Sequence, residues 1–293
     1  MTMLDDDRAL GDRLAGVRGV MFDIDGCLIL SDTSSGHAGI ALPGAAEAIA
    51  FVRSLGLPLV VFTNGSMQTP ASIAANLRGL GIDVADDEVL TPAVVAADIA
   101  AERHPGRAVL VFGGPGITDV FAARGVPIAD AEAALRDGPS DAPLVVVGWD
   151  IAFGREKLLV AAEAVKAGAD ILVTSDAPSF ASSHRLNVGV AGFIAAGLRH
   201  VTGRDYEIAG KPSASAMATI ARKLGVAAEE VLVVGDDVAL ESAMAAAAGA
   251  PSVLVTTGTS SRADALVLDP GARPFVVDSL GELVAAWRSG AEG

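Results

Sequence analysis

The chain has 293 residues, of which 51% are hydrophobic and 19% charged, and its formal net charge is −15. This apolar content excludes intrinsic disorder, and the length allows one large domain or two modest ones. The acidic balance argues against nucleic-acid or membrane partners, and the single cysteine, Cys27, allows no disulfide within the chain. We expect a cytoplasmic protein, because the acidic start of the chain is the opposite of a signal peptide.

Short runs of Val, Leu and Ile alternate with Ala-rich helical stretches along the whole chain. In chain order, the predicted strands are residues 19–22, 58–62, 108–112, 144–147, 171–174, 231–234 and 252–255. Continuous apolar runs that alternate with helices are typical of parallel sheets buried on both faces. The sequence therefore predicts a doubly wound α/β fold, in which ligands bind beyond the carboxyl ends of the strands.

Polar side chains follow three of these strands, and a lysine opens the helix predicted to end near residue 224. The residues that could share one site are Asp23, Asp25, Thr63, Asn64, Asp236 and Lys211. Carboxylates at neighbouring strand ends repel one another unless a cation joins them, and Mg²⁺ prefers such oxygen ligands. The lysine and the Thr-Asn pair add hydrogen-bond donors for an anion, so the pattern indicates a site for phosphate and magnesium together.

Each of these residues also has an ordinary structural interpretation. An aspartate after a strand is often a helix N-cap or a turn residue, and Thr63 and Asn64 could form a turn and a cap. Lys211 alone would more often be a solvated lysine at a helix end. Asp23 and Asp25 carry more weight as a pair, because residues two apart point to the same side of an extended chain. The joint pattern favours a shared site.

In this order the motifs resemble those of the haloacid dehalogenase-like (HAD) phosphohydrolases. Residues 20–26 look like the first motif, 60–64 like the second, 210–212 like the third and 231–237 like the fourth. The resemblance covers nearly the whole chain.

The interval between Thr63 and Lys211 is far longer than the roughly 30 residues that one helix–strand unit needs. It therefore predicts an inserted domain with its own strand–helix alternation, which resembles the α/β cap of the NagD-type branch. We expect a discontinuous HAD core of residues 1–91 and 204–293, with a smaller cap domain of residues 92–203.

The resemblance implies specific roles for three aspartates. Asp23 would be the nucleophile that forms an aspartyl-phosphate, and Asp25 the general acid and then the general base. Asp23, Asp25 through its backbone carbonyl, and Asp236 would bind Mg²⁺.

Thr63, Asn64 and Lys211 would hold the phosphate, with loop amides around Asn64 assisting. The fourth motif has Glu241 where relatives usually carry Asp, so either Asp237 or Glu241 would support the metal ligands.

These features predict a Mg²⁺-dependent phosphoric monoester hydrolase acting on a small phosphorylated metabolite of the sugar, glycerol, glycolate or nucleotide type. The alternative is an HAD-fold protein with weak or no catalysis that binds or senses a phosphometabolite, because the fourth motif and the cap segment 174–177 depart from the usual pattern. A phospho-accepting receiver domain fits less well, since a receiver has no place for a cap. The resemblance also implies a homodimer formed through the cap. Cys27 is interpreted either as a small packing residue or as an oxidation-sensitive thiol beside the nucleophile.

Overall fold

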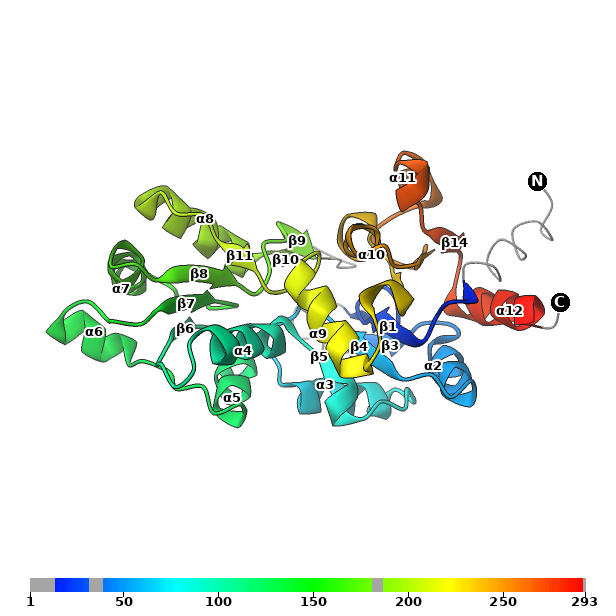
Figure 1. Cartoon of the computed structure of the whole chain (residues 1–293), viewed down its shortest axis with the longest axis horizontal. Helices are drawn as coiled ribbons and strands as arrows, with labels where there is room; N and C mark the ends of the chain where they lie inside the picture. Colours follow the sequence, from blue (N-terminus) through cyan, green and yellow to red (C-terminus); the bar gives the residue numbers. More distant parts are fainter. Residues whose placement is uncertain (1–13, 32–38, 181–186, 292–293) are drawn as a thin grey trace.

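The computed structural model describes residues 14–31, 39–180 and 187–291 (Figure 1). Its main sheet has six parallel strands in the order β14-β13-β12-β1-β4-β5. These strands are β1 (Gly19–Asp23), β4 (Leu59–Phe62), β5 (Val89–Leu90), β12 (Val231–Gly235), β13 (Ser252–Val255) and β14 (Phe275–Val277). β1, the first strand in sequence, lies in the middle of the sheet, with β12 on one side and β4 on the other.

Helices cover both faces of this sheet, because its strands are apolar on both sides. Val20 and Phe22 pack into the hydrophobic cluster on one face, while Met21 between them packs into the cluster on the other. The helices on the first face are α2 (Ala45–Ser54), α3 (Pro70–Gly79) and α12 (Leu280–Ala291). Those on the second face are α4 (Pro92–Arg103), α9 (Ala214–Leu224) and α10 (Ala243–Ala248).

A second, smaller sheet has four parallel strands in the order β11-β8-β7-β6. These strands are β6 (Leu110–Phe112), β7 (Leu144–Val147), β8 (Asp170–Val173) and β11 (Glu207–Ile208). The accompanying helices are α5 (Pro115–Ala123), α6 (Ala131–Asp137), α7 (Arg155–Lys166) and α8 (Val190–Thr202). Figure 1 shows this cap at the left and the main sheet with its helices at the right.

The two sheets share one hydrophobic cluster. It contains Val60 and Phe62 of β4 together with Val146 of β7 and Leu172 of β8, joined through side chains of α4 and α5. A separate cluster fills the other face of the cap beneath α7 and α8. The cap is therefore packed against the core through continuous apolar contact. The predicted boundaries at 91/92 and 203/204 stay a prediction; the second sheet itself spans β6 to β11.

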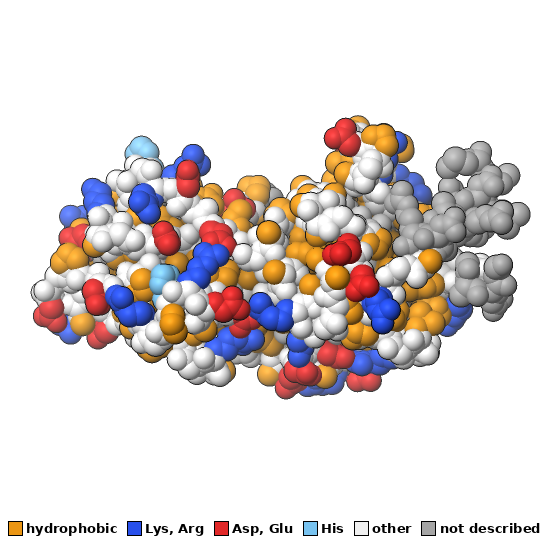
Figure 2. Space-filling model, in the orientation of Figure 1, with side chains coloured by type: hydrophobic (Ala, Val, Ile, Leu, Met, Phe, Trp, Pro, Cys, Tyr) orange, Lys and Arg blue, Asp and Glu red, His pale blue; other side chains and the backbone are white. Residues whose placement is uncertain are grey.

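Two antiparallel hairpins and several short turns complete the described chain. The hairpins are β2 (Ile29–Ser31) with β3 (Gly39–Ala41), and β9 (Ser179–Phe180) with β10 (Asn187–Val188). The shorter elements are η1 (Asp86–Glu88), η2 (Ala228–Glu230), η3 (Val238–Ser242), η4 (Pro270–Ala272) and α11 (Arg262–Leu266). Within the described ranges, no helix is long and apolar enough to cross a membrane. Figure 2 shows acidic and basic side chains interspersed over the visible face of the molecule.

All seven predicted strands are present, and α9 ends at the predicted Leu224. The strands that the sequence did not reveal have only two or three residues each, as in β5, β11 and β14. Such segments are too short to show a period, and only pairing with a neighbouring strand makes them part of a sheet.

Candidate active site

Three neighbouring strands bring the predicted site residues to one edge of the main sheet. In the register, Phe22 pairs with Val234 of β12, and Asp23 pairs with Phe62 of β4. All three strands are parallel, so their carboxyl ends lie side by side. Asp23, Thr63 and Asp236 come from these ends, and all three are buried.

Lys211 lies in the centre of this edge and is only 2% exposed. Its ammonium group contacts Oδ1 of Asp23, Oε1 of Glu241 at 2.6 Å and the carbonyl oxygen of Phe62 at 3.1 Å. A lysine has three N–H donors, so each of them has an acceptor here. An incoming phosphoryl oxygen must therefore take the place of one of these partners.

The charge of Lys211 is held in place by its carboxylate neighbours. Burial acts to lower the pKa of Lys211, but the carboxylates of Asp23 and Glu241 outweigh burial and raise it. The lysine thus stays charged, although it is enclosed by protein. Burial raises the pKa of Asp23, as do Glu241 and Asp236, while Lys211 opposes that shift.

Asn64 positions Lys211 through its backbone. The side-chain nitrogen of Asn64 donates to the Lys211 carbonyl at 2.9 Å, and its oxygen accepts from the Lys211 N–H at 2.8 Å. The structure thus places the Asn64 amide on the chain that carries the lysine. Its predicted contact with a phosphate stays a prediction.

Thr63 and Asp25 form a second pair in the site. The Thr63 hydroxyl donates to Oδ2 of Asp25 at 3.0 Å and accepts from the N–H of Gly65 at the same distance. Asp25 is exposed at the edge of the site, yet the surrounding protein still raises its pKa by desolvation, against the effects of Thr63 and Lys211. A carboxyl group with a raised pKa keeps its proton to higher pH, which suits a general acid.

Asp236 is 4% exposed, and its Oδ2 accepts a hydrogen bond of 2.6 Å from the N–H of Thr259. Burial raises the pKa of Asp236 to about 6, and the nearby carboxylate of Glu241 adds to the shift. The Thr259 N–H and Lys211 oppose it. The ionised form of Asp236 is thus less favourable than it would be in water, and a further positive charge beside it would stabilise that form.

The two acidic residues after Asp236 take different positions. Glu241 lies in η3, is 2% exposed, and binds both Lys211 and the N–H of Asp237, the latter at 3.1 Å. The Asp237 side chain points away and accepts from the N–H of Ala239 at 2.8 Å, as the N-cap of η3. Glu241 therefore belongs to the buried cluster and Asp237 to its surface.

These donors fit a magnesium ion. Four carboxylates, those of Asp23, Asp25, Asp236 and Glu241, surround one ammonium group, and burial with mutual repulsion raises the pKa of Asp23 and Asp236. No three His, Cys, Asp or Glu side chains of the described residues are grouped so that they alone could hold a metal. The predicted set needs only two such side chains, Asp23 and Asp236, because the third ligand is the Asp25 carbonyl. Carboxylate and carbonyl oxygens are the ligands that Mg²⁺ accepts.

Comparison with known proteins identifies the family. Two family models match, described as haloacid dehalogenase-like hydrolase over residues 20–127 and as HAD-hydrolase-like over residues 208–283. The acid sugar phosphatase of Staphylococcus epidermidis is 30% identical over 223 residues, which cover 76% of this chain and 83% of that protein. The chain belongs to the haloacid dehalogenase-like hydrolases.

Two further HAD phosphatases are similar along most of the chain. The ribonucleotide monophosphatase NagD of Escherichia coli is 29% identical over 85% of this chain and 91% of its own length. Its solved structure matches with a TM-score of 0.78 at 27% identity, covering 91% of this chain and 98% of that one. A glycerol phosphate phosphatase from Mycobacterium tuberculosis, solved with magnesium, also has a TM-score of 0.78, at 28% identity, covering 92% of this chain and 76% of that one. The predicted HAD family, its NagD-like branch, the α/β fold class and an HAD-type phosphatase are thereby confirmed.

The loop after β13 also contacts the candidate site, and its residues were not among the predicted site residues. Besides the Thr259 bond to Asp236, the Thr257 hydroxyl donates to the carbonyl of Gly26 at 2.6 Å, and Ser260 donates to the Asp236 carbonyl at 2.9 Å. The available signal was a run of Thr, Gly and Ser directly after a predicted strand, the same signal that pointed to Thr63.

Cys27 is a buried packing residue. It is fully buried, and its thiol lies 3.9 Å from the carbonyl oxygen of Val234. Burial and the surrounding carboxylates of Asp23, Asp236 and Glu241 raise its pKa well above the usual range. Because the thiolate is the oxidation-prone form, this environment argues against the oxidation-sensitive interpretation.

The cap meets the core beside the site. The hydroxyls of Ser66 and Thr174 lie 3.4 Å apart, which joins the loop after β4 to the loop after β8. At the start of α5, a Cβ on Gly116 would come within 2.5 Å of the Ser66 carbonyl oxygen, so only glycine permits this approach. The glycine-rich segment 113–116 therefore serves as a packing turn. In cap segment 174–177, whose sequence departs from the usual pattern, Asp176 accepts a hydrogen bond of 3.4 Å from Tyr206.

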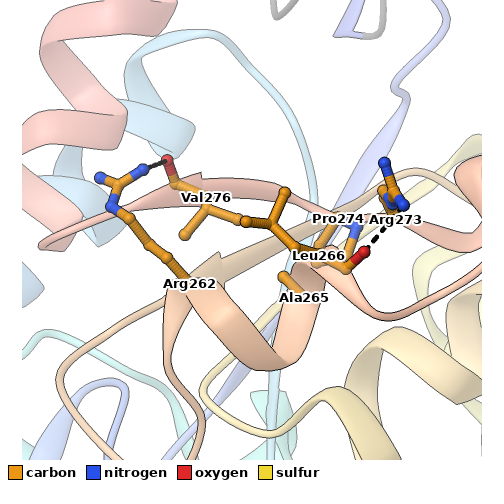
Figure 3. Close-up of a pocket in the computed structure, with 6 residues that line it drawn as sticks. All are labelled: Arg262, Ala265, Leu266, Arg273, Pro274 and Val276. Atoms are coloured by element: carbon orange, nitrogen blue, oxygen red, sulfur yellow. Dashed lines mark hydrogen bonds between the residues drawn. The ribbon is translucent and has the colours of Figure 1, made fainter.

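A surface cavity of about 210 Å³ lies elsewhere, between α11 and β14 (Figure 3). Its lining residues are Arg262, Ala265, Leu266, Arg273, Pro274 and Val276. Arg262 donates to the carbonyl of Val276 and Arg273 to that of Leu266, so both guanidinium groups hold the surrounding chain. None of the predicted site residues lines this cavity.

Proposed function

We propose that the protein is a Mg²⁺-dependent phosphatase that hydrolyses the phosphate monoester of a small metabolite through an aspartyl-phosphate on Asp23. One observation carries the proposal. Asp23, a buried lysine and a carboxyl group of raised pKa lie together at the carboxyl ends of β1 and β4. Phosphoryl transfer depends chiefly on such positioning and on stabilisation of charge.

In the first half of the reaction, a carboxylate oxygen of Asp23 attacks phosphorus. Lys211 already faces Oδ1, which leaves Oδ2 to form the new P–O bond. The bond from phosphorus to the leaving alcohol breaks, and its electron pair stays with the alcohol oxygen. Asp25 gives that oxygen its proton, so the alcohol leaves neutral and Asp25 becomes a carboxylate.

In the second half, Asp25 acts as the base. It takes a proton from a water molecule whose oxygen attacks the phosphorus of the aspartyl-phosphate. The bond between phosphorus and Asp23 breaks, which restores the carboxylate and releases inorganic phosphate. Lys211 and Thr63 supply hydrogen-bond donors beside the phosphoryl group, and Asn64 keeps Lys211 in position. Mg²⁺ bound by Asp23, the Asp25 carbonyl and Asp236 would neutralise charge on the phosphoryl oxygens.

The position of the cap is the argument for a small substrate. Loops after β6 and β8 of the cap contact the loop after β4 next to Thr63, so the leaving group would lie between cap and core. The relatives are named ribonucleotide monophosphatase, acid sugar phosphatase and glycerol phosphate phosphatase. We propose that the substrate is a phosphate of the sugar, glycerol, glycolate or nucleotide type.

The test is hydrolysis of p-nitrophenyl phosphate and of a panel of metabolite phosphates, with Mg²⁺ and with EDTA. We expect activity that EDTA abolishes and that Asp23→Asn lowers by at least about 1,000-fold, as for removal of a nucleophile. Asp264→Asn on α11 is the control, because this carboxylate is exposed and, among the described residues, bonds within its own helix start. Full activity in Asp23→Asn would refute the assignment of Asp23 as the nucleophile. No turnover across the panel would favour the alternative, a phosphometabolite-binding protein.

A further inference from the structure

Glu241 has both carboxylate oxygens committed inside the site. Oε1 lies 2.6 Å from the ammonium nitrogen of Lys211, and Oε2 accepts from the N–H of Asp237 at 3.1 Å. The side chain is 2% exposed and Lys211 is equally buried. A carboxylate supplies two acceptors, and here each one faces a donor from a different part of the chain.

The backbone around Glu241 is shaped for its length. Glu241 lies in η3, a single π-helical turn. Such turns are rare in proteins, and those that occur are frequently at functional sites. The side chain crosses the last residue of β12, Gly235, where a Cβ would lie 2.2 Å from Cγ and 2.7 Å from Oε2 of Glu241. Only glycine at that strand end lets the longer side chain pass to the lysine.

We propose that Glu241 is a positioning residue for Lys211 and not a support for the metal ligands. Lysine carries its charge on a flexible four-carbon stem, so the ammonium group needs fixed partners to stay beside the nucleophile. Glu241 provides one on the side away from the Lys211 backbone, which Asn64 already holds. The inference rests on the proposed phosphatase function and adds a residue to it.

Two substitutions test the charge of the Glu241 side chain and its length separately. Glu241→Gln keeps the length but has only one acceptor, so in either orientation an amide N–H faces the Lys211 ammonium or the Asp237 N–H. Glu241→Asp keeps the charge and both acceptors but is shorter by one C–C bond, about 1.5 Å. Both should let the ammonium group move.

We expect each substitution to lower kcat for p-nitrophenyl phosphate by about 10- to 100-fold, the effect of misplacing a catalytic group by about 1 Å. The Mg²⁺ concentration for half-maximal activity should change by less than about threefold, because the metal ligands are untouched. Asp237→Asn is the matched comparison. It lies in the same turn and its amide oxygen can still cap η3, so kcat should stay within about twofold.

Two measurements do not depend on turnover. Calorimetric titration with MgCl₂ should give the same affinity, within about threefold, for the wild type, Glu241→Gln and Glu241→Asp. Crystal structures of both variants should show the Lys211 ammonium displaced from Asp23 while Asp236 stays in place. Unfolding monitored by circular dichroism shows that each variant is folded, and the second variant serves if the first is not.

The outcomes divide cleanly. A tenfold or greater loss of Mg²⁺ affinity in Glu241→Gln with an unmoved lysine would overturn the proposal and make Glu241 a metal support. Unchanged kcat with an unmoved lysine would overturn it as well. If the wild type hydrolyses no phosphate ester, the phosphatase function fails, while the crystal structures and titrations still decide what Glu241 holds.

Discussion

Asp25 is the residue whose environment differs most from that of its neighbours. Asp23 and Asp236 are buried beside Lys211 and Glu241, whereas Asp25 lies exposed at the edge with the Thr63 hydroxyl on one oxygen. Its raised pKa extends the protonated form to higher pH. The pKa of Asp23 is raised as well, so the two carboxyl groups differ in their contacts: Asp23 faces the Lys211 ammonium group and Asp25 the Thr63 hydroxyl.

This assignment predicts a dependence on the leaving group. Asp25→Asn should lower kcat/KM, which covers only the first half of the reaction, by at least about 100-fold for alkyl phosphates but by less than about tenfold for p-nitrophenyl phosphate. The reason is that a basic alkoxide needs a proton as it leaves and p-nitrophenolate does not. Steady-state rates across phosphate esters of graded leaving-group pKa would measure it. A loss of equal size for every ester would contradict the acid role.

The sequence predicted which residues belong to the site better than it predicted which of them touch. Four site residues could be recognised because each stands directly beside a predicted strand or helix. Asp23, Thr63 and Asp236 follow strands, and Lys211 precedes a helix. The bonds from Asn64 to Lys211 join residues 147 positions apart, and no local pattern records them. The choice between Asp237 and Glu241 likewise depended on the path of one turn.

At the scale of elements, the position of α5 depends on a missing side chain. Its first turn lies against the backbone of the loop after β4, and a Cβ on Gly116 would be 2.4 Å from the carbonyl carbon of Met67. That loop continues directly from Thr63 and Asn64. A change at Gly116 should therefore reach Thr63 and Asn64, the predicted phosphate-binding residues, through the backbone.

We expect Gly116→Ala to lower kcat/KM for p-nitrophenyl phosphate by about 10- to 100-fold and the free energy of unfolding by about 1–3 kcal/mol, the usual effect of overpacking. Kinetics and urea unfolding would measure the two effects. Gly79→Ala at the end of α3 is the control, since its Cβ would meet nothing within 4 Å. That variant should keep wild-type activity and gain about 0.5–1 kcal/mol of stability. Equal behaviour of the two variants would contradict the packing argument.

For the whole molecule, the balance of buried charge links metal binding to stability. Ionised Asp23 and Asp236 repel each other and Glu241 within the fold, and burial adds to the cost of both charges. In the unfolded chain these groups are solvated and apart. A cation that binds only the folded protein should therefore stabilise it.

We expect Mg²⁺ to raise Tm, with a gain of about 2.7 kcal/mol in unfolding free energy at 100 times Kd. Asp236→Asn should abolish this dependence on Mg²⁺ and, without the metal, should be at least as stable as the wild type because one buried charge is gone. Differential scanning calorimetry with MgCl₂ and with EDTA would measure both effects. A Tm of Asp236→Asn that still rises with Mg²⁺ would contradict the predicted ligand set.

The outer face of the cap bears on assembly, and we propose that the protein is a homodimer joined through it. On α8, Phe193 is 79% and Val201 43% exposed, and Val188 just before the helix is 54% exposed. Light scattering should give the mass of a dimer for the wild type and of a monomer for Phe193→Glu. Leu266→Glu should leave the dimer intact, because Leu266 lies on α11, outside the cap, and is 65% exposed. A monomeric wild type would refute the proposal.

The sequence by itself determined the fold class, the seven longer strands and the identity of the charged residues at their ends. It could do so because these properties are written locally, in apolar runs, in helix caps and in the polar residues that follow a strand. Only the tertiary structure decided which groups touch: Lys211 with Glu241, Asn64 with the lysine backbone, and the Thr259 N–H with Asp236. Those contacts depend on strand order and on the course of a single turn, and neither leaves a periodic signal in the chain.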